Sequence, residues 1–138
     1  MYPEDMVLPM RQELVDAGLN EARTAEDIAT TIEGKQGTAF VVINSVCGCA
    51  AANARPAVRM ALKQSDKLPD RMVTSFAGND VDAVNKARQL MAPFPPSSPS
   101  MALFKDGELV HMIERHHIEG RPAELIAENL IEAFKEHC

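Results

Sequence analysis

The stretch Thr38-Ala39-Phe40-Val41-Val42-Ile43-Asn44-Ser45-Val46-Cys47-Gly48-Cys49 decides the fold, because a strand signal and a reactive motif meet in it. Residues 38–43 are β-branched or apolar throughout, which is typical of a strand buried on both faces of a sheet. A helix is expected to begin at about Cys49 and to run to about Lys63, with Pro56 kinking it. Both cysteines therefore lie where a buried strand ends and a helix begins.

The chain on either side of this stretch alternates between helix and strand signals. Hydrophobic periodicity and capping residues predict helices at 5–18, 24–33, 80–91 and 122–137, and strands at 72–76, 101–104 and 109–113. Thr24 and Asp80 are the expected N-caps, and Asp106-Gly107 is the expected hairpin turn. Two strands joined by a helix imply a parallel crossover, to which the hairpin adds antiparallel strands. The prediction is one α/β domain over residues 1–138, with a mixed four-stranded sheet flanked by helices on both faces.

Composition and charge exclude several classes of function. Apolar residues make up 46% of the 138 residues, so the chain is globular rather than disordered. The formal net charge is -6 and no Lys/Arg cluster occurs, so neither a nucleic-acid partner nor an anionic membrane surface is expected. The acidic opening lacks the basic and apolar regions of a signal peptide, and no apolar run is long enough to span a membrane. These observations predict a cytoplasmic protein.

Cys47 and Cys49 have the position that thiol chemistry requires. The start of a helix offers unpaired N–H groups and the positive end of its dipole, which stabilise a thiolate and lower a cysteine pKa from ~8.5 to as low as ~3.5–7.5. The thiolate is the form that attacks disulfides. A second cysteine two residues on can attack a mixed disulfide formed on the first, and Gly48 would permit the backbone conformation that so small a ring needs. We expect the Cys47–Cys49 disulfide to form only transiently during turnover.

Two other interpretations of the pair stay open at this point. The cysteines could be small buried hydrophobes, although a strand–helix junction is an exposed place for them. They could also hold zinc or copper together with His116, His117 or Cys138, although zinc sites usually have longer spacers between cysteines. No nucleotide or flavin motif occurs, so no bound cofactor is expected and reducing equivalents must come from another thiol.

The residues around the cysteines resemble the bacilliredoxin family. The match is carried by VINSVCGCAA (42–51) followed by ARPA (54–57). It extends over nearly the whole chain, through LPMR (8–11), EL (13–14), FAG (76–78), PSSPSMAL (96–103), HMIERH (111–116) and AFKEHC (133–138).

The resemblance implies a thioredoxin-like fold and a reaction. Bacilliredoxins reduce mixed disulfides between proteins and bacillithiol, a low-molecular-weight thiol. Cys47 would attack the mixed disulfide and take the bacillithiol, Cys49 would be the resolving thiol, and free bacillithiol would act as co-substrate that regenerates the enzyme. The implied partners are S-bacillithiolated client proteins. Some members have been viewed instead as disulfide isomerases, so a general protein disulfide oxidoreductase or isomerase is the alternative.

The resemblance also implies a substrate groove, and one departure qualifies it. Ser98-Pro99 resembles the cis-proline loop of thioredoxin-like folds, in which the residue before the proline pairs with an extended substrate. Gly48, Ser98 and Pro99 are therefore the expected substrate-binding residues. The chain lacks the Trp-Cys-Gly-Pro-Cys pattern of thioredoxin, and in the predicted order of elements a helix replaces the first strand of that fold.

Three further residues are candidates for accessory roles. Cys138 is either a loose terminal thiol or a third redox thiol that traps Cys47 or Cys49, or links two chains. His116 and His117 are expected in a solvated loop, where His116 would be able to act as an acid or base. Arg55 is expected to be structural or to hold a carboxylate of the bound thiol co-substrate.

Overall fold

The elements follow the predicted order, with three short additions. In the computed structural model, which describes residues 1–138, they are α1 (Glu4–Ala17), β1 (Asn20–Glu21), α2 (Ala25–Ile32), β2 (Thr38–Asn44), η1 (Ala50–Ala54), α3 (Arg55–Gln64), β3 (Arg71–Phe76), α4 (Val81–Leu90), β4 (Ser100–Lys105), β5 (Glu108–Ile113), α5 (Arg115–Ile118) and α6 (Ala123–His137).

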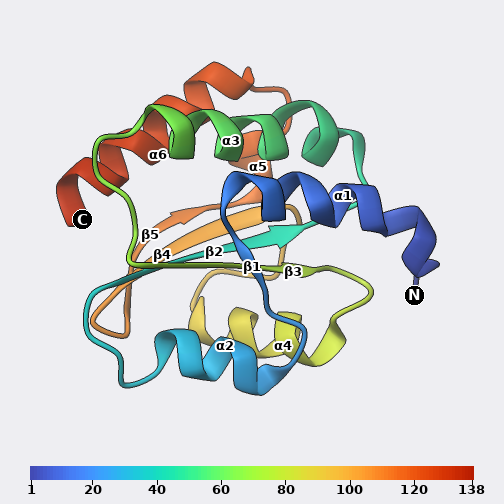
Figure 1. Cartoon of the computed structure of the whole chain (residues 1–138), viewed down its shortest axis with the longest axis horizontal. Helices are drawn as coiled ribbons and strands as arrows, with labels where there is room; N and C mark the ends of the chain where they lie inside the picture. Colours follow the sequence, from blue (N-terminus) through green and yellow to red (C-terminus); the bar gives the residue numbers. More distant parts are fainter.

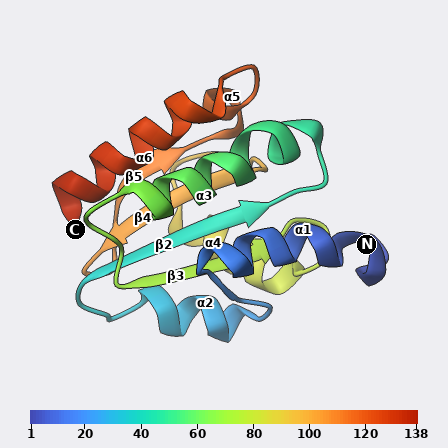
Figure 2. The ribbon, with the colours of Figure 1, turned by 45° about the horizontal axis from the view of Figure 1, so that its top comes forward.

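The sheet has the strand order β1-β3-β2-β4-β5, in which β1, β3 and β2 run parallel and β4 and β5 are antiparallel neighbours. Helices α1, α3 and α6 cover one face, while α2 and α4 cover the other (Figure 1). Figure 2 shows α3 lying between α1 and α6. The mixed sheet with helices on both faces is confirmed, but the strand count of four is wrong. The strand that seemed to be missing is β1, whose two residues are too few to give a period.

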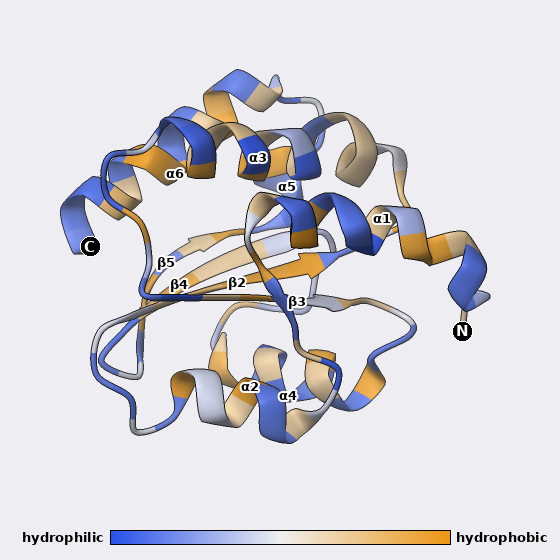
Figure 3. Ribbon diagram, in the orientation of Figure 1, coloured by the Kyte–Doolittle hydropathy of each residue, from blue (hydrophilic) through white to orange (hydrophobic).

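Strand β2 contributes to a core on each side of the sheet. Phe40 and Val42 belong to the cluster under α3 and α6, whereas Val41 and Ile43 belong to the cluster over α2 and α4. The ring of Phe40 meets Phe134 of α6 edge-on with centroids 5.2 Å apart, a geometry that adds roughly 1 kcal/mol beyond burial. Figure 3 shows β2 coloured mostly hydrophobic along its length. The prediction of a strand buried on both faces is therefore correct.

The predicted caps have different outcomes. Thr24 caps α2 through its hydroxyl, which accepts the Asp27 N–H at 3.1 Å, and Gly18 ends α1 in the left-handed conformation. Asp80 precedes α4 but makes no capping bond. Its carboxylate instead accepts the Phe76 N–H at 2.8 Å and pairs with the buried Arg11. The ion pair with Arg11 therefore uses the Asp80 carboxylate that the local sequence predicts as the cap of α4.

Pro56 lies inside a continuous helical segment, as expected, and the segment departs from α-helical geometry just before it. A proline inside a helix has no N–H to donate and its ring clashes with the preceding turn, so that turn has to adjust. The residues before Pro56, Ala50–Ala54, form a π turn, η1, which continues directly into α3. The irregularity therefore falls between Cys49 and the regular helix. None of the helices combines the length and apolar character needed to cross a membrane.

Candidate active site

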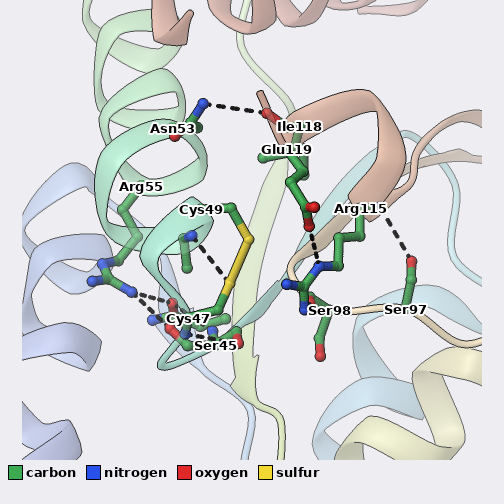
Figure 4. Close-up of a disulfide and its surroundings, with 12 residues drawn as sticks. Ser45, Cys47, Cys49, Asn53, Arg55, Ser97, Ser98, Arg115, Ile118 and Glu119 are labelled. Carbon is green, nitrogen blue, oxygen red and sulfur yellow. Dashed lines mark hydrogen bonds and ion pairs between the residues drawn. A yellow bond between two sulfur atoms is a disulfide. The ribbon is translucent and has the colours of Figure 1, made fainter. Parts of the chain in front are cut away.

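The segments that carry the reactive residues meet at one end of the sheet, where β2 ends and β4 begins. In the parallel pair β2–β3, Ile43 is beside Ser75, and on its other side Ile43 is beside Ser100 at the start of β4. In the hairpin, Ile113 at the end of β5 is beside Met101. The segments that follow β2 and β5 and the one that precedes β4 therefore meet there. They bring Cys47-Gly48-Cys49, Ser98-Pro99 and Arg115 to one place (Figure 4).

The structure joins Cys47 and Cys49 in a disulfide with Cα atoms 5.4 Å apart. Both cysteines are half-buried, and Gly48 between them is exposed. The pair is therefore neither a set of core hydrophobes nor a mid-element feature. That the disulfide forms only during turnover remains a prediction.

Backbone N–H groups surround Cys47. The Ala50 N–H donates to Cys47 Sγ at 3.3 Å, and the N–H groups of Ala50 and Ala51 donate to the Cys47 carbonyl at 3.1 and 3.2 Å. The Cys47 N–H in turn donates to Ser45 Oγ at 3.3 Å. A donor aimed at Sγ stabilises negative charge there once the disulfide is reduced. The start of the helical segment thus supplies what a thiolate needs, and supplies it to Cys47.

Neither backbone conformation nor lack of space requires a glycine at position 48 in this structure. Its backbone lies outside the left-handed region, so the expectation that the ring needs a glycine conformation is wrong. A Cβ built at this position would meet no atom within 4 Å. Position 48 therefore faces open space, and a role of Gly48 in substrate binding stays a prediction.

Arg55 positions the segment before Cys47 and is not offered to a ligand. Its side chain is 4% exposed. Nη1 donates to Asn44 Oδ1 at 3.0 Å and to the Ser45 carbonyl at 2.8 Å, while Nε pairs with Glu13 at 2.9 Å. These bonds hold the chain between the end of β2 and Cys47. The hypothesis that Arg55 holds a carboxylate of the thiol co-substrate is not supported, because burial keeps its guanidinium from solvent.

Replacing Arg55 by Met should lower both stability and turnover. Loss of the three bonds leaves the Ser45 carbonyl and Asn44 without their buried donor, which costs about 2–3 kcal/mol of unfolding free energy. A displaced Ser45 loosens Cys47, and we expect turnover to fall about tenfold. Urea titration and thiol-exchange rates measure the two effects.

Arg59→Met is the matched control, because Arg59 pairs with the same Glu13 but is 47% exposed. We expect it to cost less than about 1 kcal/mol and to leave turnover unchanged. Equal losses in the two variants would show that the contacts to Asn44 and Ser45 do not matter.

The loop before β4 faces the disulfide. The Ser98–Pro99 peptide bond is cis, in agreement with the prediction, and Pro99 is buried while Ser98 is half-buried. The Ser98 carbonyl accepts Arg115 Nη1 at 3.1 Å, and Ser97 Oγ accepts the Arg115 N–H at 3.3 Å. Ser98 and Pro99 therefore lie at the end of the sheet that carries the thiols, and Arg115 holds their loop. Their binding of substrate stays a prediction.

His116 and His117 lie on the short helix α5 rather than in a loop. Their ligand atoms and those of Glu114 fall within 4.8 Å of one another, whereas the sequence suggested histidines beside cysteines. The Glu114 N–H donates to His117 Nδ1 at 3.1 Å, so Nε2 carries the hydrogen and a metal ligand would have to give up this bond. Burial and the neighbouring His116 lower the pKa of His117, which favours this neutral form. Glu114 and His117 cap the start of α5, and the cluster is a poor metal site.

Cys138 lies at the opposite end of β2 from Cys47. The charges of Asp70 and Lys105 act on its thiol, and Lys105 pairs with Thr38, the first residue of β2. A strand of this length spans roughly 20 Å, far beyond the ~7 Å between Cα atoms that a disulfide allows. The hypothesis that Cys138 traps Cys47 or Cys49 within one chain is therefore wrong. The same distance does not bear on a disulfide that joins Cys138 to a second chain.

The thiol of Cys138 should react slowly at neutral pH. Although the residue is exposed as a whole, partial burial raises the pKa of its thiol, so less thiolate is present than in the unfolded chain. With the Cys47–Cys49 disulfide intact, we expect iodoacetamide to label the native protein more slowly than the urea-unfolded protein, and the difference to shrink as the pH rises. Faster labelling of the native protein would contradict this. Cys138→Ser should take up no label and should keep full turnover.

Sequence reasoning missed Ser45 and Arg115 as site residues. Arg115 could have been found from the hairpin, because a strand antiparallel to β4 must end where β4 begins, next to Ser98-Pro99. Ser45 carries no such signal, since its role depends on how the chain turns between Asn44 and Cys47.

A parallel crossover and an antiparallel hairpin in one sheet, with paired thiols at the start of a helix and a cis-proline loop facing them, define a thioredoxin-like oxidoreductase that acts on thiols and disulfides. The structure of Fasciola hepatica thioredoxin matches with a TM-score of 0.61 and 20% identity, covering 87% of this chain and 100% of that one. Oxidised Plasmodium falciparum thioredoxin matches with a TM-score of 0.58 and 15% identity, covering 88% and 100%. Identities this low establish the fold alone.

The chain belongs to the bacilliredoxin family. A family model described as disulphide isomerase matches residues 2–138. The bacilliredoxin of Cytophaga hutchinsonii is 55% identical over 136 residues, covering 99% of each chain. The bacilliredoxin of Bacillus licheniformis is 53% identical over 137 residues, covering 99% of this chain and 95% of that one. That of Salinibacter ruber is 51% identical, covering 99% and 81%.

Proposed function

We propose that this oxidoreductase removes bacillithiol from mixed disulfides on client proteins. The observation that carries the proposal is the Cys47-Gly48-Cys49 pair at a helix start, in a chain 53–55% identical to proteins named bacilliredoxin. Cys47 is the attacking thiol, because its sulfur accepts an N–H from the helix start and that of Cys49 has no such donor.

The reaction begins with the reduced pair. The Cys47 thiolate attacks the bacillithiol sulfur of the mixed disulfide, a new S–S bond forms there, and the client cysteine leaves as a thiolate that takes a proton from water. Cys49 then attacks Cys47 Sγ and releases bacillithiol, which leaves the Cys47–Cys49 disulfide. Two further bacillithiol molecules reduce that disulfide and leave as their own disulfide, so electrons balance without a bound cofactor.

The second candidate is disulfide isomerisation, which the description of the matching family favours. An isomerase attacks disulfides within a polypeptide and must accommodate extended chain beside Cys47. The two candidates therefore differ in which substrate turns over.

The test offers both substrates to the same reduced enzyme. A single-cysteine protein carrying bacillithiol is followed by intact mass, and a protein with scrambled disulfides is followed by recovery of its activity. With free bacillithiol supplied as the reductant in both assays, we expect loss of the adduct at substoichiometric enzyme and no acceleration of reshuffling. The reverse pattern would replace the proposal by isomerisation.

A further inference from the structure

Arg115 places an exposed guanidinium beside the disulfide. It begins α5 directly after Glu114, and Figure 4 shows its side chain and that of Glu119 on the side of the disulfide opposite Arg55. The Arg115 side chain is 44% exposed. Arg55, by contrast, is buried and turned away. Of these two arginines, Arg115 is the one whose guanidinium is open to a ligand on the thiols.

The guanidinium is held in place but retains donors. Nε pairs with Glu119 at 2.7 Å, and Nη1 donates to the Ser98 carbonyl at 3.1 Å. Nη2 has no protein partner, so its two N–H groups stay free to donate to a carboxylate. Two fixed contacts also mean that little side-chain freedom is left to lose on binding.

The same contact limits what else can bind. A polypeptide that pairs with the segment before Pro99 in the manner of a β-strand needs the Ser98 carbonyl as an acceptor. Arg115 already donates to that carbonyl and leaves only one of its two acceptor positions for a peptide N–H. An extended chain would have to fit beside the guanidinium, whereas a small thiol would not.

We propose that Arg115 binds a carboxylate of the low-molecular-weight thiol in the mixed disulfide and thereby selects acidic thiols as the group transferred to Cys47. This inference rests on the proposed function, because it names the chemistry recognised at the same site. The class of substrate is a client cysteine disulfide-bonded to a small thiol that bears a carboxylate within reach of Nη2.

The test compares two adducts of one size on one single-cysteine protein, formed with mercaptopropionate and with mercaptopropanol. They differ in a carboxylate against a hydroxyl, so the ratio of their kcat/KM values reports recognition of charge. We expect wild type to favour the mercaptopropionate adduct about fivefold, and Arg115→Met to bring the ratio close to one. A purely structural role for Arg115 would slow both adducts and leave the ratio unchanged.

Two variants sharpen the result. Arg121→Met removes the same charge from an exposed arginine that makes no ion pair, and should keep the wild-type ratio. Glu119→Gln keeps an acceptor for Nε but removes the competing carboxylate, and should raise the ratio about twofold. An equal ratio in wild type and Arg115→Met overturns the inference while leaving the proposed function intact. If wild type turns over neither these adducts nor the bacillithiol adduct, the proposed function fails and the inference fails with it.

Discussion

Replacing Cys47 by Ser is expected to reduce removal of the bacillithiol adduct to the uncatalysed rate. The hydroxyl of serine is not ionised at neutral pH and cannot form the S–S bond that takes the bacillithiol from the client. The fold should persist, because Cys47 is only half-buried and its backbone bonds to Ala50 and Ala51 do not involve sulfur. Intact mass of the client over time measures the effect, and circular dichroism checks the fold.

Cys49→Ser separates the two halves of the reaction. The variant should still remove bacillithiol from the client, but the adduct should then remain on Cys47 until free thiol displaces it. Cys138→Ser is the matched control, since it removes a cysteine from the far end of β2 and should leave every step unchanged. If Cys49→Ser were inactive and Cys47→Ser active, the roles of the two thiols would be exchanged.

Replacing Arg11 by Met should cost about 3–5 kcal/mol of unfolding free energy. The side chain of Arg11 is 3% exposed, and its Nη1 and Nη2 bind the two carboxylate oxygens of Asp80 at 2.8 and 2.9 Å. The guanidinium also lies 5.4 Å from the centre of the Phe76 ring. Without Arg11, the buried Asp80 carboxylate keeps only its bond from the Phe76 N–H, and an uncompensated charge remains in the interior. Urea titration followed by circular dichroism gives the difference.

Arg23→Met is the control for this prediction. Arg23 pairs with Glu4 and Glu21, the two other carboxylates that Arg11 contacts, but it is 44% exposed. We expect it to cost less than about 1 kcal/mol. In Arg11→Met/Asp80→Leu the unpaired charge is gone, so the double variant should be more stable than Arg11→Met alone. A double variant less stable than both single variants would contradict a buried ion pair as the cause.

The sheet, and the end of it that carries the site, could be predicted because the sequence patterns that indicate them are local or follow from the order of the elements. Residues 39–43 of β2 are all apolar, so the strand has to be covered on both faces. The junction between this strand and the next helix is visible in the sequence, and it locates Cys47 at the start of a helix. The hairpin at Asp106-Gly107 then fixed the direction of the last two strands.

The features that the sequence did not predict depend on long-range contacts, about which the periodicity of the sequence carries no information. Strand β1 exists because two residues pair with Val73 and Thr74 of β3. The local sequence predicts Asp80 as a cap, but its carboxylate pairs with Arg11, which is far away in the chain. Arg55 has the chemistry to bind a carboxylate, and only its burial against Ser45 assigns it to positioning.

The far placement of the C-terminus has a practical consequence. The C-terminus lies near the start of β2, as Figure 1 shows, whereas Cys47 follows the other end of that strand. A fluorescent domain joined after Cys138 would therefore lie away from the thiols. The C-terminus is thus the end of the chain at which a reporter domain can be joined without covering the redox pair.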